Sequence, residues 1–175
     1  WALPGIYGDA YWASFDVDFP GTMTHINENP VPATAFAGDF VKGDNDYVYV
    51  IDNPANNLYK MDKTTGTSTL IGPTGLTGTV GCMASNRSTG DVYVIDGQNL
   101  YTLDITTGAT TLVGGIGGGS ELWVGLACDN NGNLYVHGIS SDVIWTIDPS
   151  TGAGTLLGPT GVNANYAQDM ACDPA

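Results

Sequence analysis

Several acidic and amide side chains of the sequence stand at spacings that could bind a cation. Asp9, Asp52 and Asp96 end similar apolar segments, so three carboxylates could gather at one edge of the fold. Asp129 and Asn131 belong to the run Asp-Asn-Asn-Gly-Asn, which offers the closely spaced oxygen ligands that calcium prefers. Neither set contains the complete twelve-residue calcium loop with its terminal Glu. The competing interpretation is that the first set are solvated strand ends and the second an ordinary turn, so calcium is one alternative and no other cofactor is predicted.

A second group of aspartates recurs along the chain together with a glycine four or five positions later. The aspartates are Asp16, Asp62, Asp104 and Asp148, and the glycines are Gly21, Gly66, Gly108 and Gly152. An Asp at the start of a type I turn accepts backbone amides, and the later Gly adopts the left-handed conformation that closes a hairpin. These residues are therefore predicted to form turns and not to bind metal.

Catalytic groups are sparse in the sequence. It contains two histidines, His25 and His137, and neither lies in a recognisable nucleophile–base arrangement. A pair of carboxylates for glycoside chemistry stays open, because the separation of such a pair is invisible in sequence. We predict that the protein is not an enzyme, and a propeller-fold lyase or hydrolase is the weakest alternative.

Aromatic residues divide into those that recur and those that do not. Tyr49, Tyr93 and Tyr135 stand at equivalent places and are predicted to pack in the core. The candidates for binding a ligand or protein partner are the residues that break the pattern, namely Trp1, Tyr11, Trp12, Trp123 and Tyr166, together with His137. Aromatic surfaces supply a large contact area at low entropic cost. Core packing is the competing interpretation.

The element that positions these residues is a repeated hairpin. Residues 101–114, YTLDITTGATTLVG, alternate apolar and polar positions on both sides of a turn, as in two paired strands. Residues 59–72 and 145–158 are near-copies, and residues 15–26 are a weaker fourth copy with its turn at Pro20 and Gly21. Four short strands in each unit of about 44 residues are the spacing of a β-propeller. We predict an all-β single domain over residues 1–175, a β-propeller of four four-stranded blades.

The predicted blades leave the first one split between the two ends of the sequence. The blades are residues 1–34 with 167–175, 35–78, 79–122 and 123–166. Residues 167–173 reproduce an inner strand, which would complete the first blade within the chain or in a neighbouring molecule. The residues proposed for this strand exchange are Gln168, Asp169, Met170, Ala171, Cys172 and Asp173.

The repeat resembles the blades of secreted and cell-surface bacterial β-propeller proteins. The shared pattern is Leu-Tyr-x-Ile-Asp-x-x-Thr-Gly-x-x-Thr-x-Ile-Gly, and residues 59–72, 101–114 and 145–158 match it closely. The resemblance implies the fold, whereas activities vary among such proteins. The first hairpin departs from the pattern, because it carries no Thr-Gly pair.

Charge and cysteine content limit the partners and the compartment. Eighteen acidic residues face four basic ones, which gives a net charge of -14. Such a surface repels phosphate backbones, so nucleic acid is not a predicted partner, and no apolar segment is long enough for membrane insertion. The sequence begins with Trp and not Met, which suggests export and an extracellular or cell-surface location. Cys128 and Cys172 occupy equivalent repeat positions and are predicted either as small buried residues or as a disulfide.

Three hypotheses for the function follow. The first is an extracellular structural or adhesion module, with possible head-to-tail assembly into a filament by strand donation. The second is a module that binds a carbohydrate or another small polar ligand, with or without calcium. The third is the lyase or hydrolase. The partners would be further copies of the chain, a surface glycan or another protein.

Overall fold

Three four-stranded antiparallel sheets form the body of the protein. The computed structural model describes residues 11–16, 18–27, 34–164 and 170–172. The first sheet contains β3 (Ala35–Asp39), β4 (Tyr47–Asp52), β5 (Asn57–Asp62) and β6 (Ser68–Pro73). The second contains β7 (Val80–Ser85), β8 (Val92–Asp96), β9 (Asn99–Leu103) and β10 (Thr110–Gly115). The third contains β11 (Trp123–Cys128), β12 (Leu134–Gly138), β13 (Val143–Ile147) and β14 (Gly154–Pro159).

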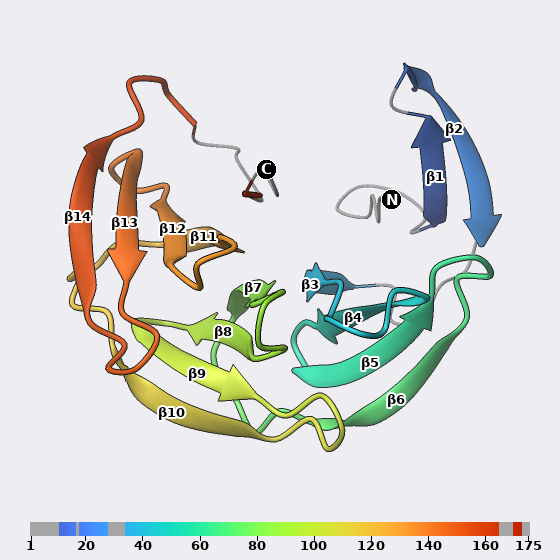
Figure 1. The fold of residues 1–175 in the computed structure, drawn as a ribbon, viewed down its shortest axis with the longest axis horizontal. Coiled ribbons are helices and arrows are strands. Elements are labelled where there is room, and N and C mark those ends of the chain that lie inside the picture. The colour runs from blue at the N-terminus through green and yellow to red at the C-terminus, as the bar shows by residue number, and fades with distance from the viewer. Residues whose placement is uncertain (1–10, 17, 28–33, 165–169, 173–175) are drawn as a thin grey trace.

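The sheets follow one another along an arc. The inner strands β3, β7 and β11 lie nearest its centre, and β6, β10 and β14 lie at its outer rim (Figure 1). A two-stranded sheet of β1 (Trp12–Asp16) and β2 (Phe19–Asn27) continues the arc beyond β3 to β6 (Figure 1). The all-β prediction and the four-strand repeat are thus confirmed. Four blades closed by a carboxyl-terminal strand stay a prediction, because most of the residues in question lie outside the described ranges.

The repeated turn has the predicted chemistry. In the hairpin of β9 and β10, the backbone amide of Thr106 donates to Asp104 Oδ1 at 2.8 Å, and Gly108 has a φ of 84°. The prediction is wrong for the first hairpin, since Asp16 pairs with Phe19 and β2 already begins there. Asp16 Oδ1 accepts the amide of Asp18 at 2.9 Å, so the aspartate fixes this shorter turn without needing Gly21.

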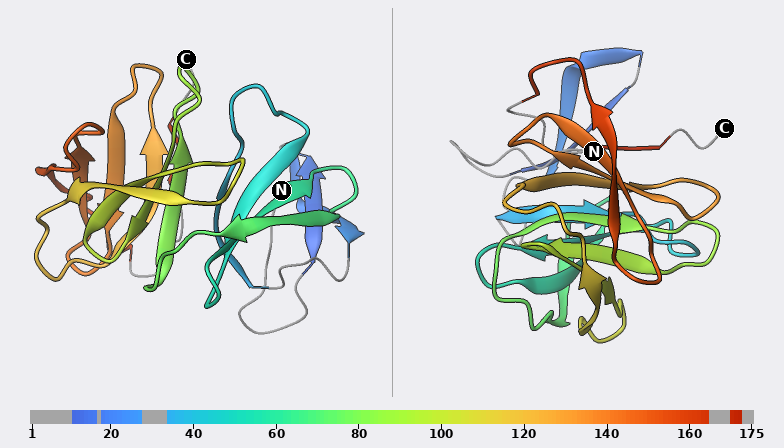
Figure 2. Two further views of the ribbon diagram at one scale, coloured as in Figure 1. Left: turned by 90° about the horizontal axis from the view of Figure 1, so that it is seen from below. Right: turned by 90° about the vertical axis from the view of Figure 1, so that its left-hand side faces the viewer.

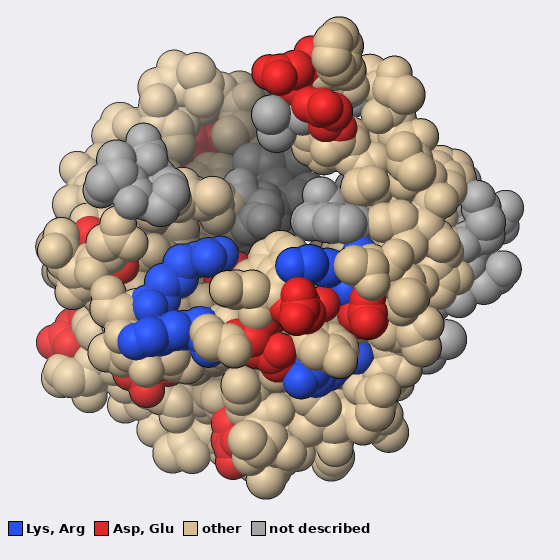
Figure 3. Space-filling model, turned by 45° about the vertical axis from the view of Figure 1, so that its right-hand side comes forward, with Lys and Arg blue, Asp and Glu red and all other residues tan. Residues whose placement is uncertain are grey.

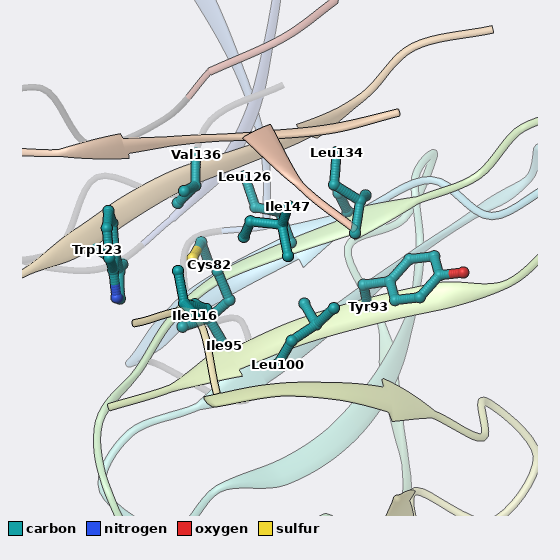
Figure 4. Close-up of a cluster of buried hydrophobic side chains, with 11 residues drawn as sticks. Cys82, Tyr93, Ile95, Leu100, Ile116, Trp123, Leu126, Leu134, Val136 and Ile147 are labelled. Atoms are coloured by element: carbon teal, nitrogen blue, oxygen red, sulfur yellow. The ribbon is translucent and has the colours of Figure 1, made fainter. Parts of the chain in front are cut away.

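Apolar clusters fill the contacts between adjacent sheets, which we call joints. The joint between the second and third sheets buries eleven residues, among them Ile95 and Leu100 from one sheet and Leu126 and Val136 from the other (Figure 4). Two further clusters fill the joint between the first and second sheets and the joint between the first sheet and β1–β2. Burial of such side chains stabilises the fold by about 1.5 to 3 kcal/mol each. The core therefore consists of successive apolar clusters, one in each joint between neighbouring sheets.

The same two repeat positions meet in every joint. One is the residue before the turn aspartate, and the other is the residue near the end of the outer strand of the preceding sheet. The pairs that share a cluster are Ile26 with Met61, Ile71 with Leu103, and Val113 with Ile147. The residues before the aspartate, Met61, Leu103 and Ile147, are 0%, 6% and 3% exposed. Each joint thus repeats one contact.

A glycine at the end of each outer strand lets the sheets approach. A Cβ at Gly72 would overlap the carbonyl oxygen of Thr107 in the next hairpin. A Cβ at Gly114 would overlap the carbonyl oxygen of Thr151 in the same way. The last glycine of the sequence motif therefore has a packing role between sheets.

The side views show the sheets standing next to one another, each with its own twist (Figure 2). In the part of the chain that the structure describes, no helix has the length and apolar character needed to cross a membrane.

Candidate functional site

A cavity lies where the inner strands end. It measures about 310 Å³ and is lined by β3, β7, β11, the turns that follow β7 and β11, and residues 170–172. From Met83 through Ser85 to Arg87, its lining changes from apolar to charged. Leu126, Ala127, Cys128 and Asn130 line it in the same order from the neighbouring strand. The repeat therefore builds a cavity with an apolar floor and a polar mouth. Its size lies at the low end of the range of ligand pockets.

Hydrogen bonds between neighbouring inner strands hold the wall of this cavity. Ser85 Oγ donates to the carbonyl oxygen of Phe40 at 2.6 Å, and the Ser85 amide donates to Asp39 Oδ2 at 2.8 Å. Asp39 Oδ1 also accepts the amide of Phe40 at 2.7 Å. These bonds place the Asp39 carboxylate beside the cavity in a fixed orientation, and they show that equivalent positions of adjacent inner strands lie close together.

Cys128, at the end of β11, and Cys172, in the segment 170–172, both line the cavity. All three cysteines of the chain are free thiols in the structure, and Cys82 is buried elsewhere. Burial, reinforced by the neighbouring Asp129 carboxylate, raises the pKa of Cys128 to about 11. Burial also raises the pKa of Cys172. Both thiols are therefore neutral near pH 7, and the predicted disulfide between them stays a prediction.

All four basic side chains of the protein come from the face of the molecule at which the cavity opens. They stand in or next to the turns that follow β3, β5 and β7, and they gather beside a hollow in the surface (Figure 3). Lys60 Nζ lies 2.7 Å from Asp44 Oδ2, and Lys63 Nζ lies 3.3 Å from Asp46 Oδ1. Lys42 Nζ donates to the carbonyl oxygen of Ser88. Arg87 makes no hydrogen bond or ion pair with the described residues, so its guanidinium is available at the mouth.

The strand-end aspartates already accept backbone amides of the same chain. Asp52 Oδ1 accepts the amide of Asn57 at 2.6 Å, and Asp96 Oδ2 accepts the amide of Gly78 at 3.1 Å. Asp9 lies outside the described residues, so a site that uses all three carboxylates stays a prediction. Within the described ranges, no group of three or more His, Cys, Asp or Glu side chains could hold a metal ion.

In the second predicted calcium site, the Asp129 oxygens accept hydrogen bonds from other residues of the same turn. Asp129 Oδ1 accepts the amides of Asn131 and Asn133 at 2.9 and 2.8 Å. Asp129 Oδ2 accepts from Asn133 Nδ2 at 2.8 Å. These bonds, with that of the Asn133 side chain the strongest, hold the pKa of Asp129 below its usual value. The turn explains the residue types without a cation.

Two of the unmatched aromatic residues, Trp12 and Trp123, lie in joints. Trp12 is 3% exposed, and its Nε1 donates to the carbonyl oxygen of Lys63 at 2.9 Å. Trp123 is also 3% exposed, and its Nε1 donates to Gln98 Oε1 at 3.1 Å. Both side chains are therefore core residues and not surface platforms. Tyr11 stacks on His25 with ring centroids 4.0 Å apart. Trp1 and Tyr166 lie outside the described residues.

His137 lies on the side of the third sheet that faces away from the second. It is 6% exposed and occupies the register position of Ile51 and Ile95. Its Nε2 lies 3.9 Å from Asp142 Oδ1 and makes no hydrogen bond. Being buried, His137 is not an exposed ligand contact.

The predicted strand-exchange segment is described only in part. Met170, Ala171 and Cys172 line the cavity of their own chain, next to its inner strands. Gln168, Asp169 and Asp173 lie outside the described residues. Pairing of this segment within or between chains stays a prediction.

The two ends of the arc expose residues whose counterparts are buried or partly buried in the joints. Phe15 precedes Asp16 as Leu103 precedes Asp104, yet it is 42% exposed. Leu157 precedes Gly158 as Val113 precedes Gly114, yet it is 58% exposed. A Cβ at Gly158 would have no atom within 4 Å, unlike one at Gly114. Among the described residues, the ends thus carry the two halves of a joint that these residues do not form with each other.

No family model and no curated protein matches the sequence. Solved structures do match the fold. A Bacteroides thetaiotaomicron protein of unknown function is 21% identical, with a TM-score of 0.63, and the match covers 85% of this chain and 38% of that one. The virginiamycin B lyase of Staphylococcus aureus is 15% identical, with a TM-score of 0.59 and coverage of 83% and 48%. A chain of a nidogen/laminin complex is 16% identical, with a TM-score of 0.63 and coverage of 91% and 58%.

The chain has a β-propeller fold. It spans between about two fifths and three fifths of the length of these propeller neighbours. At such low identities the likeness shows the fold alone, and the neighbours differ in function. Propeller repeats are thus established for this chain, whereas its activity and partners are not transferred from the neighbours.

Proposed function

We propose that the protein is a structural propeller module that associates head to tail with further copies of itself. In this arrangement the β14 end of one copy packs on the β1 end of the next. The observation that carries the proposal is the exposure of Leu157 and Phe15, whose counterparts pair in every joint. Pairing between copies would bury both side chains as the internal joints do.

The contact is heterologous, because the two ends present different surfaces. Such contacts build open filaments, or rings if the rotation between copies closes. The turn of β1 and β2 would approach Gly158, as the Asp148–Gly152 turn approaches Gly114. This version leaves Met170, Ala171 and Cys172 in their own chain and needs no exchange of a strand.

An extracellular adhesion role is the biological setting that we propose for such a module. The acidic surface and the resemblance to secreted bacterial repeats support it. One propeller neighbour comes from a nidogen/laminin complex, in which a propeller-containing chain is present in an assembly with another protein. A lyase or hydrolase activity is the weakest hypothesis, because the lyase neighbour shares only the fold with this chain.

Sedimentation velocity tests the proposal over a wide range of protein concentrations. We expect the sedimentation coefficient of the wild-type chain to rise with concentration and that of Leu157→Asp to stay at the monomer value. Leu112→Asp is the matched control, because Leu112 is also 58% exposed but lies on the rim of an internal sheet. A monomer at every concentration would contradict the proposal, as would equal loss of association in both variants.

A further inference from the structure

The cavity at the ends of the inner strands combines one available cation, Arg87, with one oriented carboxylate, Asp39. The Arg87 guanidinium stands at the mouth without a partner among the described residues, whereas the other three basic side chains bond to protein oxygens. A guanidinium has five N–H donors in a planar fork that matches a carboxylate. This end of the cavity is therefore suited to an anionic group of a ligand.

Asp39 supplies the opposite charge on the same cavity. Each of its oxygens accepts one backbone amide, at 2.7 and 2.8 Å. An ionised carboxylate has about four acceptor positions, so Asp39 can still accept from a ligand ammonium group. The amides hold it in place whether or not a ligand is bound.

The other described residues of the lining are uncharged. Met83, Leu126 and Met170 supply thioether and aliphatic surface, and Ala127 and Ala171 add small apolar contacts. The thiols of Cys128 and Cys172 are neutral near pH 7 and behave as small apolar groups. This surface favours a compact apolar side chain of the ligand over a sugar ring with hydroxyls on every carbon.

The charge of the whole protein narrows the ligand class further. At a net charge of -14, a free anion is repelled from the protein, whereas a molecule without net charge is not. We propose that the cavity binds a zwitterionic apolar α-amino acid. Its carboxylate would meet Arg87, its ammonium group Asp39, and its side chain the floor at Met83 and Leu126. The site is separate from the ends of the arc, so it is independent of head-to-tail association.

Isothermal titration with leucine as the probe tests this assignment. Two analogues dissect it: 4-methylpentanoate lacks the ammonium group, and isopentylamine lacks the carboxylate. We expect saturable leucine binding and at least about tenfold weaker binding of each analogue, because each loses one charge-assisted contact. Glucose serves as the polyhydroxylated comparison. Absence of leucine binding would overturn the assignment, and so would tighter binding of glucose.

Variants assign the contacts to residues. Arg87→Met should weaken leucine binding about tenfold or more, whereas Lys63→Met, on the same face but paired with Asp46, should leave it unchanged. Asp39→Asn should lower affinity for leucine and not for 4-methylpentanoate. Equal leucine affinity in Arg87→Met and the wild type would overturn the assignment. The analogue series on the wild-type chain gives its answer even if the Asp39 variant fails to fold.

Discussion

Phe15 in β1 and Leu157 in β14 occupy the two repeat positions that pack together in every joint, yet both are exposed. Phe15 is 42% exposed, whereas its counterparts Leu103 and Ile147 are 6% and 3% exposed. Leu157 is 58% exposed, whereas its counterparts Ile71 and Val113 are partly buried in the joints. The two residues lie on elements at opposite ends of the arc (Figure 1). The β1 end and the β14 end are complementary surfaces, and every copy of the chain carries both. The β14 end of one copy can therefore pair with the β1 end of another.

Close approach of the sheets predicts a penalty for a methyl group at the joint glycines. Gly72→Ala and Gly114→Ala would each force a hairpin carbonyl away and should destabilise the fold by about 1 to 3 kcal/mol. Urea unfolding measures the change. Gly115→Ala is the control, because a Cβ there has no atom closer than 3.7 Å. Equal stability of the Gly114 and Gly115 variants would refute the packing role.

The turn aspartates predict a loss of stability in acid. Hydrogen bonds from the Thr106 hydroxyl and amide, followed by that from Thr107, hold the pKa of Asp104 below its ordinary value of 3.8. Because the folded pKa is lowered, this stabilisation is present above the unfolded value and is lost as the pH falls through the folded pKa. Unfolding at a series of pH values should show a decline in acid that is smaller in Asp104→Asn. A carboxyl pKa at or above 3.8, measured by NMR, would contradict it.

The two cavity cysteines predict a specific oxidation. Treatment with oxidised glutathione should join Cys128 to Cys172 by thiol–disulfide exchange, with two equivalents of reduced glutathione released per disulfide. Both cysteines line the same cavity. An unstrained bond across this loop should stabilise the chain by about 4 kcal/mol. Mass spectrometry after alkylation should leave only Cys82 labelled, whereas glutathione adducts without a Cys128–Cys172 bond would refute the pairing.

The occupied turn at Asp129 predicts insensitivity to calcium removal. Both Asp129 oxygens already accept bonds within the turn, at 2.8 to 2.9 Å. The melting temperature should therefore be the same with added calcium and with a chelator. A clear fall in chelator that is absent in Asp129→Asn would establish a calcium site at this turn.

The sequence predicted correctly those features that depend only on local backbone interactions of a residue type. The recurring Asp and Gly specify a tight turn through backbone hydrogen bonds and a positive φ, so the hairpins and the four-strand unit were predictable. The prediction failed for the first hairpin because its Pro20-Gly21 pair resembled a turn, whereas the chain turns between Asp16 and Phe19.

Features that depend on neighbouring sheets were not predictable. Trp12 and Trp123 differ from the repeat pattern because they fill joints. From the sequence alone, this difference was misinterpreted as a sign of ligand binding. The final glycine of the motif recurs at 72, 114 and 158, and this recurrence was a usable signal of close approach. The cavity escaped prediction because Asp39, Arg87 and Cys172 line it from segments that are far apart in the sequence.

Cross-linking between two variants that each carry one introduced cysteine tests head-to-tail association most directly. Phe15→Cys and Leu157→Cys would each be made in a chain with Cys128→Ser and Cys172→Ser, which leaves only the buried Cys82 besides the new thiol. On mixing and mild oxidation, we predict a disulfide-linked dimer containing one copy of each variant, and none when Leu112→Cys replaces Leu157→Cys. Absence of the mixed dimer, or a bond formed only within one chain that carries both new cysteines, would contradict the account.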